Sequence, residues 1–294
     1  MKNIVCFGEV LWDMLPTGKK LGGAPLNVAL RAQSMGNKTA VISSVGNDKI
    51  GDEIIEKMKM HSANLDHIQR SKNFATSEVL VHLDKNGSAS YEIKMPCAWD
   101  DIKLLEKDVE EVNNSDAFIF GSLIARSATS RETLFELLDK SEFSVFDVNL
   151  RPPHYSFETL NKLMKCADFI KFNDDEIFEI CANMGSENKS LEECIQFIAQ
   201  STKTKQICVT MGENGAVLFT ANKFFYNNGY KITVADTVGS GDSFLAAIIS
   251  KLLNGSGPQE AIDCACAVGA IVASKSGANP PVSAEEIKNL IYIA

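Results

Sequence analysis

The sequence lacks the cysteine patterns of disulfide-linked or zinc-binding domains. Its 294 residues include 8 cysteines, but they form no C-x-x-C pair and no cysteine and histidine set at zinc spacing. Most of them lie within apolar runs, where a buried free thiol is the ordinary expectation. Examples are Cys6, Cys208, Cys264 and Cys266. We therefore expect a reduced, cytoplasmic protein.

The chain also lacks an excess of basic residues and any apolar run of membrane-spanning length. Its formal net charge is -9 and its pI is about 5.1. A partner such as nucleic acid or a membrane surface would require a basic stripe. The run Met-Lys-Asn-Ile-Val-Cys-Phe-Gly at the start is typical of a strand and not of a signal peptide. We expect neither nucleic acid nor a membrane as a partner.

Two common phosphate-binding motifs are missing. No G-x-x-x-x-G-K-[ST] segment occurs, which excludes a P-loop. The segment Gly239-Ser-Gly-Asp-Ser-Phe begins like the dinucleotide motif G-x-G-x-x-G, but Phe244 replaces the third glycine. It also lies near the C-terminal end and not in a first β-α-β unit. A dinucleotide-binding oxidoreductase is therefore a weak alternative.

The most informative stretch is residues 233–250, in which β-branched residues give way to a glycine turn and then to a helical run opened by Asp242. Gly239 and Gly241 let a ligand approach the main chain closely. A helix N-terminus leaves amides unpaired and carries partial positive charge, so the turn suits an anion. Asp242 has two interpretations. Capping of the helix is the commoner role, whereas phosphoryl transfer to a hydroxyl requires a general base beside an anion hole.

The remaining pattern predicts one large α/β domain with a mostly parallel sheet covered on both faces. Strand-like and helical segments alternate along the chain, with a helix over residues 52–60. From Thr76 to Ile93 the pattern has period two around an Asp84-Lys-Asn-Gly turn, which predicts a hairpin belonging to a separate sheet. The predicted strands of the main sheet are residues 3–8, 39–45, 117–122, 143–149 and 168–173.

Several polar residues occur in the first segment of the chain. Asp13 lies among apolar neighbours, and alternation favours an outward strand residue over a polar group in a pocket. The pair Gly22-Gly23 precedes a helix with Pro25 in its first turn and Gly36 at its C-terminal stop. Asn27, taken alone, is more typical of a solvent-facing helix position.

Other polar residues follow successive strands, at the sheet edge where ligands gather in open α/β folds. Each has a structural alternative. Arg151 could be a loop charge, Glu176 could support the first turn of its helix, and the turn between Gly212 and Gly215 could close a hairpin. The residues in question are Asp147, Asn149, Arg151, Asn173, Glu176, Thr210, Gly212 and Gly215. Their joint occurrence at successive strand ends favours a binding site.

Five segments resemble the ribokinase-like sugar kinases, also called the PfkB carbohydrate kinases. They occur in the order and spacing of that family and span essentially the whole chain. The segments are Gly22-Gly-Ala-Pro-Leu-Asn-Val-Ala, Asp147-Val-Asn-Leu-Arg-Pro, Asn173-Asp-Asp-Glu176, Val209-Thr-Met-Gly-Glu-Asn-Gly and Asp236-Thr-Val-Gly-Ser-Gly-Asp-Ser-Phe. The resemblance implies a single kinase domain over residues 1–294 with a three-layer α/β/α sandwich. It also implies a mostly parallel central sheet and a small β-sheet lid, formed by residues 9–27 and 71–97.

The resemblance also implies roles for individual residues in ATP-dependent phosphorylation of a sugar. Asp242 would be the general base, and Gly239, Ser240 and Gly241 would line the anion hole. Asp13, Gly22, Gly23, Asn27 and Arg151 would bind the sugar. Asn173, Thr210, Gly212 and Gly215 would bind ATP, with Glu176 acting on Mg²⁺ indirectly. Lid-mediated homodimers occur in the family. Potassium dependence is in doubt because Pro281 occupies the position where potassium-activated members often have a hydroxyl residue.

The subclass that fits best is fructokinase, which converts D-fructose to fructose 6-phosphate. Three less specific segments support it: Gly8-Glu-x-Leu-x-Asp13, Pro96-x-Ala-Trp-Asp100 and Asp147-x-Asn-x-Arg151-Pro. Ribose, 2-keto-3-deoxygluconate and nucleosides remain alternative acceptors. A sugar- or nucleotide-binding regulator that kept the fold without catalysis is a further alternative, since fold alone does not imply activity.

Overall fold

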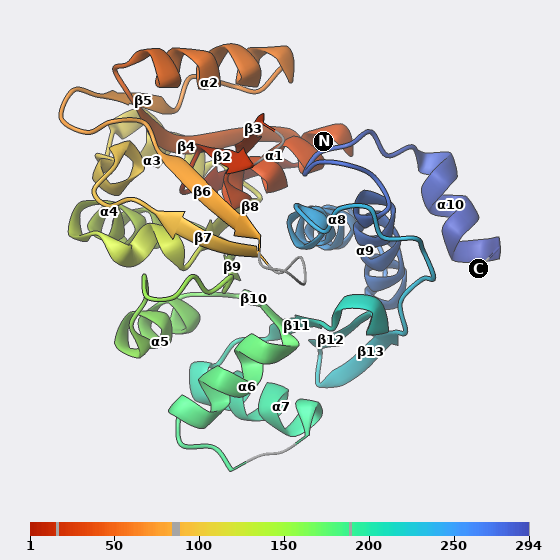
Figure 1. Cartoon of the computed structure of the whole chain (residues 1–294). Coiled ribbons are helices and arrows are strands. Elements are labelled where there is room, and N and C mark those ends of the chain that lie inside the picture. Colours follow the sequence, from red (N-terminus) through yellow and green to blue (C-terminus); the bar gives the residue numbers. More distant parts are fainter. Residues whose placement is uncertain (16–17, 84–88, 188–189, 294) are drawn as a thin grey trace.

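A large, mostly parallel sheet forms the centre of the protein (Figure 1). The computed structural model describes residues 1–15, 18–83, 89–187 and 190–293. The strand order is β13-β12-β11-β10-β9-β8-β1-β4-β5. Of these described strands, β12 alone runs in the opposite direction to the others. The strands are β1 (Asn3–Phe7), β4 (Lys38–Gly46), β5 (Ile68–Ser71), β8 (Ala117–Gly121), β9 (Ser144–Asp147), β10 (Phe169–Asn173), β11 (Gln206–Thr210), β12 (Ala216–Thr220) and β13 (Lys223–Asn227).

Helices cover both faces of this sheet. Helices α3 to α7 pack into one hydrophobic core, and α1, α2, α8 and α9 pack into the other, with α10 lying against α9. In the part of the chain that the structure describes, no helix is long and apolar enough to cross a bilayer. The helices are α1 (Ala24–Ser34), α2 (Lys49–Met60), α3 (Glu106–Asn113), α4 (Ala128–Leu138), α5 (Phe157–Lys165), α6 (Asp174–Asn183), α7 (Leu191–Thr202), α8 (Ser240–Leu253), α9 (Pro258–Ala273) and α10 (Ala284–Ile293).

The central strand β1 shows why the sheet needs two cores. Val5 and Phe7 enter the core formed with α3 to α7, whereas Ile4 and Cys6 enter the opposite core. All four side chains are fully buried. Because successive strand residues point to opposite faces, an uninterrupted apolar strand can only be buried between two helical layers. The predicted three-layer α/β/α fold is confirmed.

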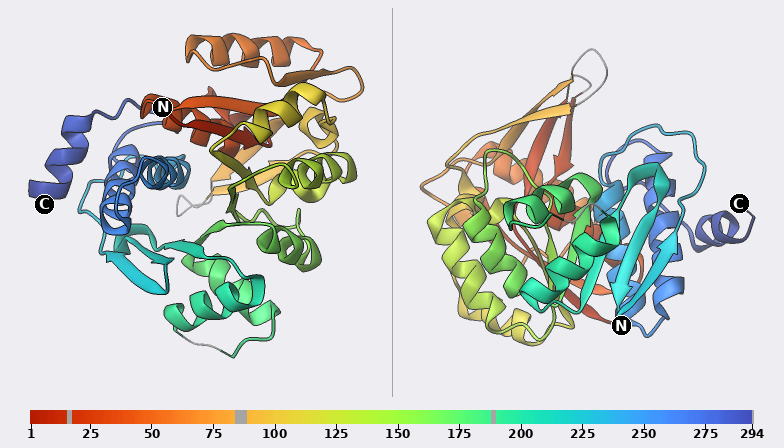
Figure 2. Two further views of the ribbon diagram at one scale, coloured as in Figure 1. Left: turned by 180° about the vertical axis from the view of Figure 1, so that it is seen from behind. Right: turned by 90° about the horizontal axis from the view of Figure 1, so that it is seen from below.

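A smaller sheet stands away from the large one (Figure 2). Its strand order is β3-β2-β6-β7, and β2 runs parallel to β6 while the other pairs are antiparallel. The strands are β2 (Leu11–Leu15), β3 (Gly18–Gly22), β6 (Glu78–Leu83) and β7 (Ala89–Ile93). The hairpin predicted from the period-two pattern is therefore confirmed, although its turn at residues 84–87 lies outside the described residues.

Two helix boundaries follow from capping chemistry. Helix α1 has Pro25 in its first turn, and Gly36 just beyond its end has a positive φ of 86°, as predicted. Helix α2 begins at Lys49, three residues earlier than residue 52 predicted from apolar periodicity. The cause is Asp48, whose side chain accepts a hydrogen bond from the Gly51 amide (2.7 Å) and so caps the helix.

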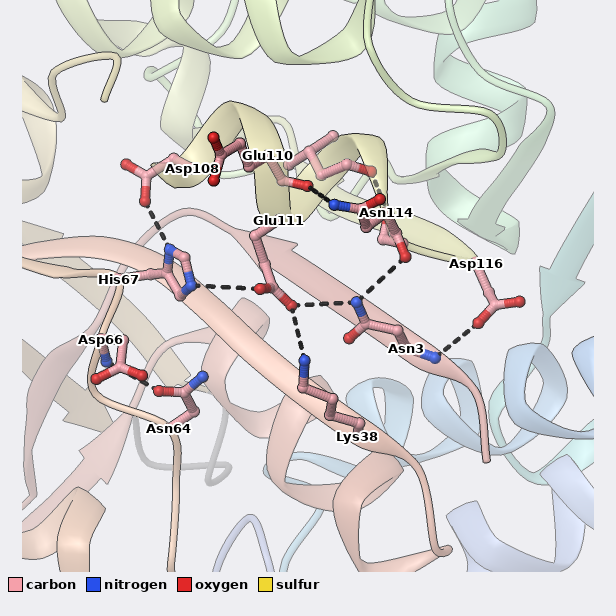
Figure 3. Close-up of polar contacts among 12 residues, drawn as sticks. Asn3, Lys38, Asn64, Asp66, His67, Asp108, Glu110, Glu111, Asn114 and Asp116 are labelled. Atoms are coloured by element: carbon pink, nitrogen blue, oxygen red, sulfur yellow. Dashed lines mark hydrogen bonds and ion pairs between the residues drawn. The ribbon is translucent and has the colours of Figure 1, made fainter. Parts of the chain in front are cut away.

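A polar cluster attaches α3 to the large sheet at the amino-terminal ends of its strands (Figure 3). His67 Nδ1 lies 2.7 Å from an oxygen of Asp108, a residue with no exposed area, and His67 Nε2 lies 3.7 Å from Glu111. Glu111 also accepts a hydrogen bond from Asn3 (3.1 Å) and pairs with Lys38 (3.5 Å). The cluster therefore joins α3 to β1, β4 and the residue before β5.

We expect His67→Ala to lower the free energy of unfolding by about 1 to 3 kcal/mol, the usual cost of leaving a buried hydrogen-bonding group, here the Asp108 carboxylate, without its partner. The loss should appear in urea denaturation monitored by circular dichroism. His61→Ala is the matched control, since His61 is exposed at the end of α2 and its loss should change stability by less than about 0.5 kcal/mol. Equal effects of the two substitutions would contradict a structural role for His67.

Candidate functional site

The glycine turn before α8 is held against the loop at residues 277–279. Gly239 has a φ of 76°, and a Cβ atom added there would lie 2.5 Å from the Ala278 carbonyl oxygen, so only glycine fits. The first helical hydrogen bond of α8 runs from the Ser243 amide to the Gly239 carbonyl (2.9 Å). The amides of Gly241 and Asp242 precede that bond and lie at the positive end of the helix, which suits an anion.

The structure corrects the expected start of α8. The helix begins at Ser240, so Asp242 is its third residue and does not open it. The N-cap position is held by Gly239, and no side chain caps the helix. Instead, an Asp242 oxygen accepts a hydrogen bond from Asn27 Nδ2 on α1 (2.8 Å). The capping interpretation of Asp242 is therefore wrong.

Asn27 connects three segments of the site. Its Nδ2 donates to Asp242 on α8, and its Oδ1 accepts a hydrogen bond from Asn279 Nδ2 (2.8 Å). The residue is buried, with an exposed fraction of 5%. The solvent-facing position that its helix register alone favours is wrong, because α1 packs lengthwise against α8. Together the two hydrogen bonds fix the orientation of the Asn27 side-chain amide, so that its nitrogen points at the Asp242 carboxylate.

Asp242 lies in an electrostatic environment that favours its protonated form. Burial raises its pKa to about 6, helped by the negative charge of Asp147 and opposed by the Asn27 hydrogen bond and by Lys171 and Arg151. A carboxyl group with such a pKa can accept a proton near neutral pH and still be deprotonated before the reaction.

Asp13 on β2 is the second carboxylate of the site. Burial and, to a smaller extent, the negative charge of Asp242 raise its pKa to about 6, against the opposing effects of Arg151 and Lys20. A Cβ atom added to Gly22 would lie 2.2 Å from an oxygen of Asp13. Gly22 is therefore required for this carboxylate to occupy its place. Asp13 is half-buried and interacts with Asp242, which supports the pocket interpretation over an outward strand residue.

Gly23 and Glu9 support each other at the start of α1. Gly23 has a φ of 111°, and a Cβ atom there would lie 2.2 Å from the Glu9 carbonyl oxygen. Glu9 accepts a hydrogen bond from the Ala24 amide (3.2 Å), while its second carboxylate oxygen is buried without a partner. Burial raises the pKa of Glu9 to about 7, opposed by Arg151. Sequence reasoning missed Glu9, although a lone acid after an apolar strand was a signal.

Arg151 supplies positive charge to this group of acids. It lowers the pKa values of Glu9, Asp13 and Asp242, and its Nη1 donates to the Leu150 carbonyl (2.9 Å). The structure therefore gathers five predicted residues around one site: Asp13, Gly22, Asn27, Arg151 and Asp242.

The neighbouring ends of β10 and β11 hold a second group of predicted residues. Asn173 and Thr210 are register partners, and the Thr210 hydroxyl donates to the Phe172 carbonyl (3.3 Å). Asn173 and Glu176 form a reciprocal capping box, each side chain bonding the other's amide at 2.8 Å. The second Glu176 oxygen accepts from the Leu150 amide (2.8 Å). Glu176 thus does support its helix, as the structural alternative predicted.

The turn after β11 also has the predicted hairpin geometry. It joins β11 to the antiparallel strand β12. Gly212 and Gly215 have φ values of 56° and 82°. A Cβ atom at Gly215 would lie 1.9 Å from the Asn227 carbonyl oxygen. These glycines close the hairpin and leave bare main chain at the sheet edge.

A buried lysine links the two groups. Lys171 on β10 pairs with Asp147 at 2.8 Å, and both side chains are less than a tenth exposed. Its Nζ lies 3.7 Å from a Cβ atom built on Gly241. Burial alone would lower the pKa of Lys171, but Asp147, Glu176 and Asp242 together raise it, so the group stays charged. The only sequence signal was one lysine inside the apolar strand Phe169–Asn173.

Comparison with known proteins agrees with this geometry. A profile described as "pfkB family carbohydrate kinase" matches residues 1–285. The chain belongs to the pfkB family of carbohydrate kinases. The resemblance noted from the sequence motifs is thereby confirmed over residues 1–285.

Fructokinase-2 of Solanum lycopersicum is 27% identical to this chain over 315 residues. The match covers 97% of this chain and 94% of the relative. A sugar kinase of Pyrococcus horikoshii in complex with ATP has a TM-score of 0.83 and 26% identity, covering 98% and 99% of the two chains. The ATP-bound fructokinase of Xylella fastidiosa has a TM-score of 0.84 at 23% identity and covers 98% of each chain. The last likeness concerns the fold alone.

We expect Asp242→Asn to stabilise the protein at pH 8. The raised pKa means that the folded state binds a proton more tightly than the unfolded state does, so this contribution to stability is complete below about pH 4 and is lost as the pH rises through about 6. Asp242 keeps partial solvent exposure, so the gain should be about 1 to 3 kcal/mol. Urea denaturation at pH 4, 6 and 8 should show the gap opening with pH. A variant less stable than the parent at pH 8 would contradict the assignment.

Proposed function

We propose that the protein transfers the terminal phosphoryl group of MgATP to a hydroxyl group of D-fructose, forming fructose 6-phosphate. The observation that carries the proposal is the Asp242 carboxylate. It is oriented by Asn27 at 2.8 Å, has a pKa of about 6, and lies in the first turn of α8 beside amides that precede the first helical bond. A base and an anion-binding turn in one place are what phosphoryl transfer to an alcohol needs.

In this mechanism Asp242 accepts the proton of the attacking hydroxyl as that oxygen bonds to the terminal phosphorus of ATP, while the bond from this phosphorus to the bridging oxygen breaks and ADP leaves. Gly239, Ser240 and Gly241 form the anion hole, where main-chain amides and the helix dipole stabilise charge on the transferring group. The buried ammonium of Lys171 beneath Gly241 adds fixed positive charge to this turn. The proton of the alcohol thus moves onto the Asp242 carboxylate, whose pKa of about 6 is close to neutral pH.

The sugar would lie between the small sheet and α8. Asp13 accepts hydrogen bonds from sugar hydroxyls, Asn27 can donate or accept, and Arg151 donates. Gly22 and Gly23 let Asp13 and the Glu9 carbonyl lie directly against the main chain and so hold the sugar-binding groups in place. Lys20 on β3 forms an ion pair (3.3 Å) with Asp236, which precedes the glycine turn before α8. This pair joins the small sheet to the segment that leads into α8. We propose that this sheet acts as a lid that excludes water during transfer, and that it also offers the surface for a homodimer.

ATP would bind along the ends of β10 and β11. Asn173, Thr210, Gly212 and Gly215 line this edge, where bare main chain is available to the nucleotide. No cluster of acids, histidines or cysteines among the described residues could cage a metal ion by itself. Both oxygens of Glu176 are bound by amides, whereas one oxygen of Asp147 is buried without a partner. These residues fit a magnesium ion that arrives with the nucleotide and is contacted by Glu176 indirectly.

The loop beyond Ala278 bears on the role of potassium. The carbonyl of Pro280 accepts a hydrogen bond from Arg31 (2.8 Å), and the carbonyl of Pro281 accepts one from Lys275 (2.7 Å). Positive charge is therefore already built into this segment by side chains. The proposed reaction accordingly includes no potassium requirement, and we place it in the cytoplasm because the free thiols suit a reducing compartment.

The general base is tested with Asp242→Asn. We expect kcat to fall by at least about a hundredfold, the scale of losing a general base, while ATP affinity stays nearly unchanged. A coupled ADP-release assay measures turnover, and calorimetry measures ATP binding. Asp139→Asn, an exposed position at the end of α4, is the control and should keep full activity. Turnover near the parent's in Asp242→Asn would refute the role of Asp242.

The acceptor is tested by comparing kcat/KM for fructose, ribose, 2-keto-3-deoxygluconate, mannose, glucose and a nucleoside with MgATP. We expect fructose to be preferred, which agrees with the name of the fructokinase-2 relative from Solanum lycopersicum. Preference for another sugar would keep the role of Asp242 and reassign the pocket around Asp13, Asn27 and Arg151. If folded protein binds ATP but turns over no acceptor, the alternative of a non-catalytic sugar- or nucleotide-binding regulator gains support.

A further inference from the structure

A small cavity of about 290 Å³ lies behind the loop that follows Arg151. It is bounded by the 3-10 turn Leu123–Arg126, by α4, by the loop at residues 153–156 and by the first turn of α5. Its polar lining includes Arg126, Arg131, His154 and Ser156, and none of its described lining residues is acidic. In a chain with a net charge of -9, a cavity with two arginines and no carboxylate suits a negatively charged ligand.

Arg126 contributes a buried guanidinium to this lining, with a side chain only 2% exposed. Its Nε and Nη2 donate to the two oxygens of Asp100 (2.8 and 2.7 Å), and Nη2 also donates to the Lys94 carbonyl (2.7 Å). The guanidinium stacks 3.9 Å from the ring centroid of Trp99. Its remaining nitrogen, Nη1, is buried and has no acceptor in the protein. An unpaired buried donor is costly, so Arg126 keeps unused hydrogen-bonding capacity beside the cavity.

The other lining groups also offer donors. Arg131 uses one nitrogen, Nη1, to reach the Ala125 carbonyl (3.0 Å), which leaves further donors on its guanidinium. Ser156 caps α5, and the first helical bond of α5 runs from the Leu160 amide to the Ser156 carbonyl (2.9 Å). The positive end of α5 therefore faces the cavity. Among the nearby acids, Asp100 is paired with Arg126, Glu158 is paired with Lys162, and Glu179 accepts a hydrogen bond from Tyr155 (2.6 Å).

We propose that this cavity is an oxyanion-binding site for a phosphate group, separate from the catalytic site and bound by Arg126, Arg131 and the first turn of α5. Its volume lies at the lower end of ligand pockets, which fits inorganic phosphate or a small phosphate monoester and excludes a nucleotide. Bidentate arginine contacts are the usual protein partners of phosphate.

The position of the cavity connects a bound oxyanion to two parts of the site. Arg126 holds the Lys94 carbonyl just beyond β7 of the small sheet. The His154 amide donates to the Arg151 carbonyl (2.8 Å). A bound phosphate therefore braces the base of the small sheet and the loop that carries Arg151. The binding itself does not rest on the proposed reaction and can be tested without it.

Binding is measured through Trp99, which stacks on Arg126. The chain has 2 tryptophans, so Trp12→Phe leaves Trp99 as the only one. In this background, phosphate, sulfate and ribose 5-phosphate are titrated against sodium chloride of equal ionic strength while Trp99 emission is recorded. We expect a saturable response to phosphate and none to chloride. Tighter binding of ribose 5-phosphate than of phosphate would identify an ester as the ligand class, and the reverse order would identify the free anion.

The decisive variant is Arg131→Gln, since Arg126 cannot be removed without leaving Asp100 buried and unpaired. We expect Arg131→Gln to weaken phosphate binding at least about tenfold, the loss of one charge-assisted contact. Lys165→Gln removes the same charge from the exposed far end of α5 and should leave binding unchanged. A response shared with chloride, no response, or unchanged affinity in Arg131→Gln would overturn the proposal.

Discussion

The hydrogen bond between Asn27 and Asp242 is the contact on which the site depends. It joins α1 to α8 and brings together the two glycine turns that precede these helices. Each turn uses a positive-φ glycine that fits against main chain, Gly23 against Glu9 and Gly239 against Ala278. Because helix, turn and carboxylate are fixed together, the amides at the start of α8 and the proposed base Asp242 keep a constant relation to each other.

The site gathers charge at a cost in stability. Glu9, Asp13 and Asp242 all have raised pKa values, and burial is the largest cause in each case. The ion pair of Lys171 and Asp147 is buried close to the glycine turn before α8. Desolvation of the two charges opposes its formation. The two hydrophobic cores offset these terms, because the apolar residues of the central strands are buried in them. The rigid sheet thereby tolerates a destabilised edge, as proteins commonly do where function requires it.

Much of this architecture could be predicted because it rests on local rules. The three-layer fold follows from apolar strands alternating with helices, and the gathering of Asp13, Asn27 and Arg151 agrees with motif positions. Predictions from the position of a residue in its helix were wrong where contacts with distant segments determine its surroundings. Asn27 suits solvent until α8 is placed beside α1, and Asp242 suits a cap until Gly239 proves to hold that position. Lys171 was missed because its partner Asp147 lies on a neighbouring strand, a pairing that no local pattern contains.

The span of the Asn27 contact has a consequence for biosynthesis. Its two residues are 215 positions apart in the chain, and β1 in the middle of the sheet pairs with β4 and β8 long before α8 is made. During translation the amino-terminal strands can assemble while the ribosome is still producing the rest of the domain. The proposed site, in contrast, comes into existence only after α8 has emerged and docked. The nascent protein therefore lacks the proposed general base for most of its synthesis, whatever part of the sheet has already formed.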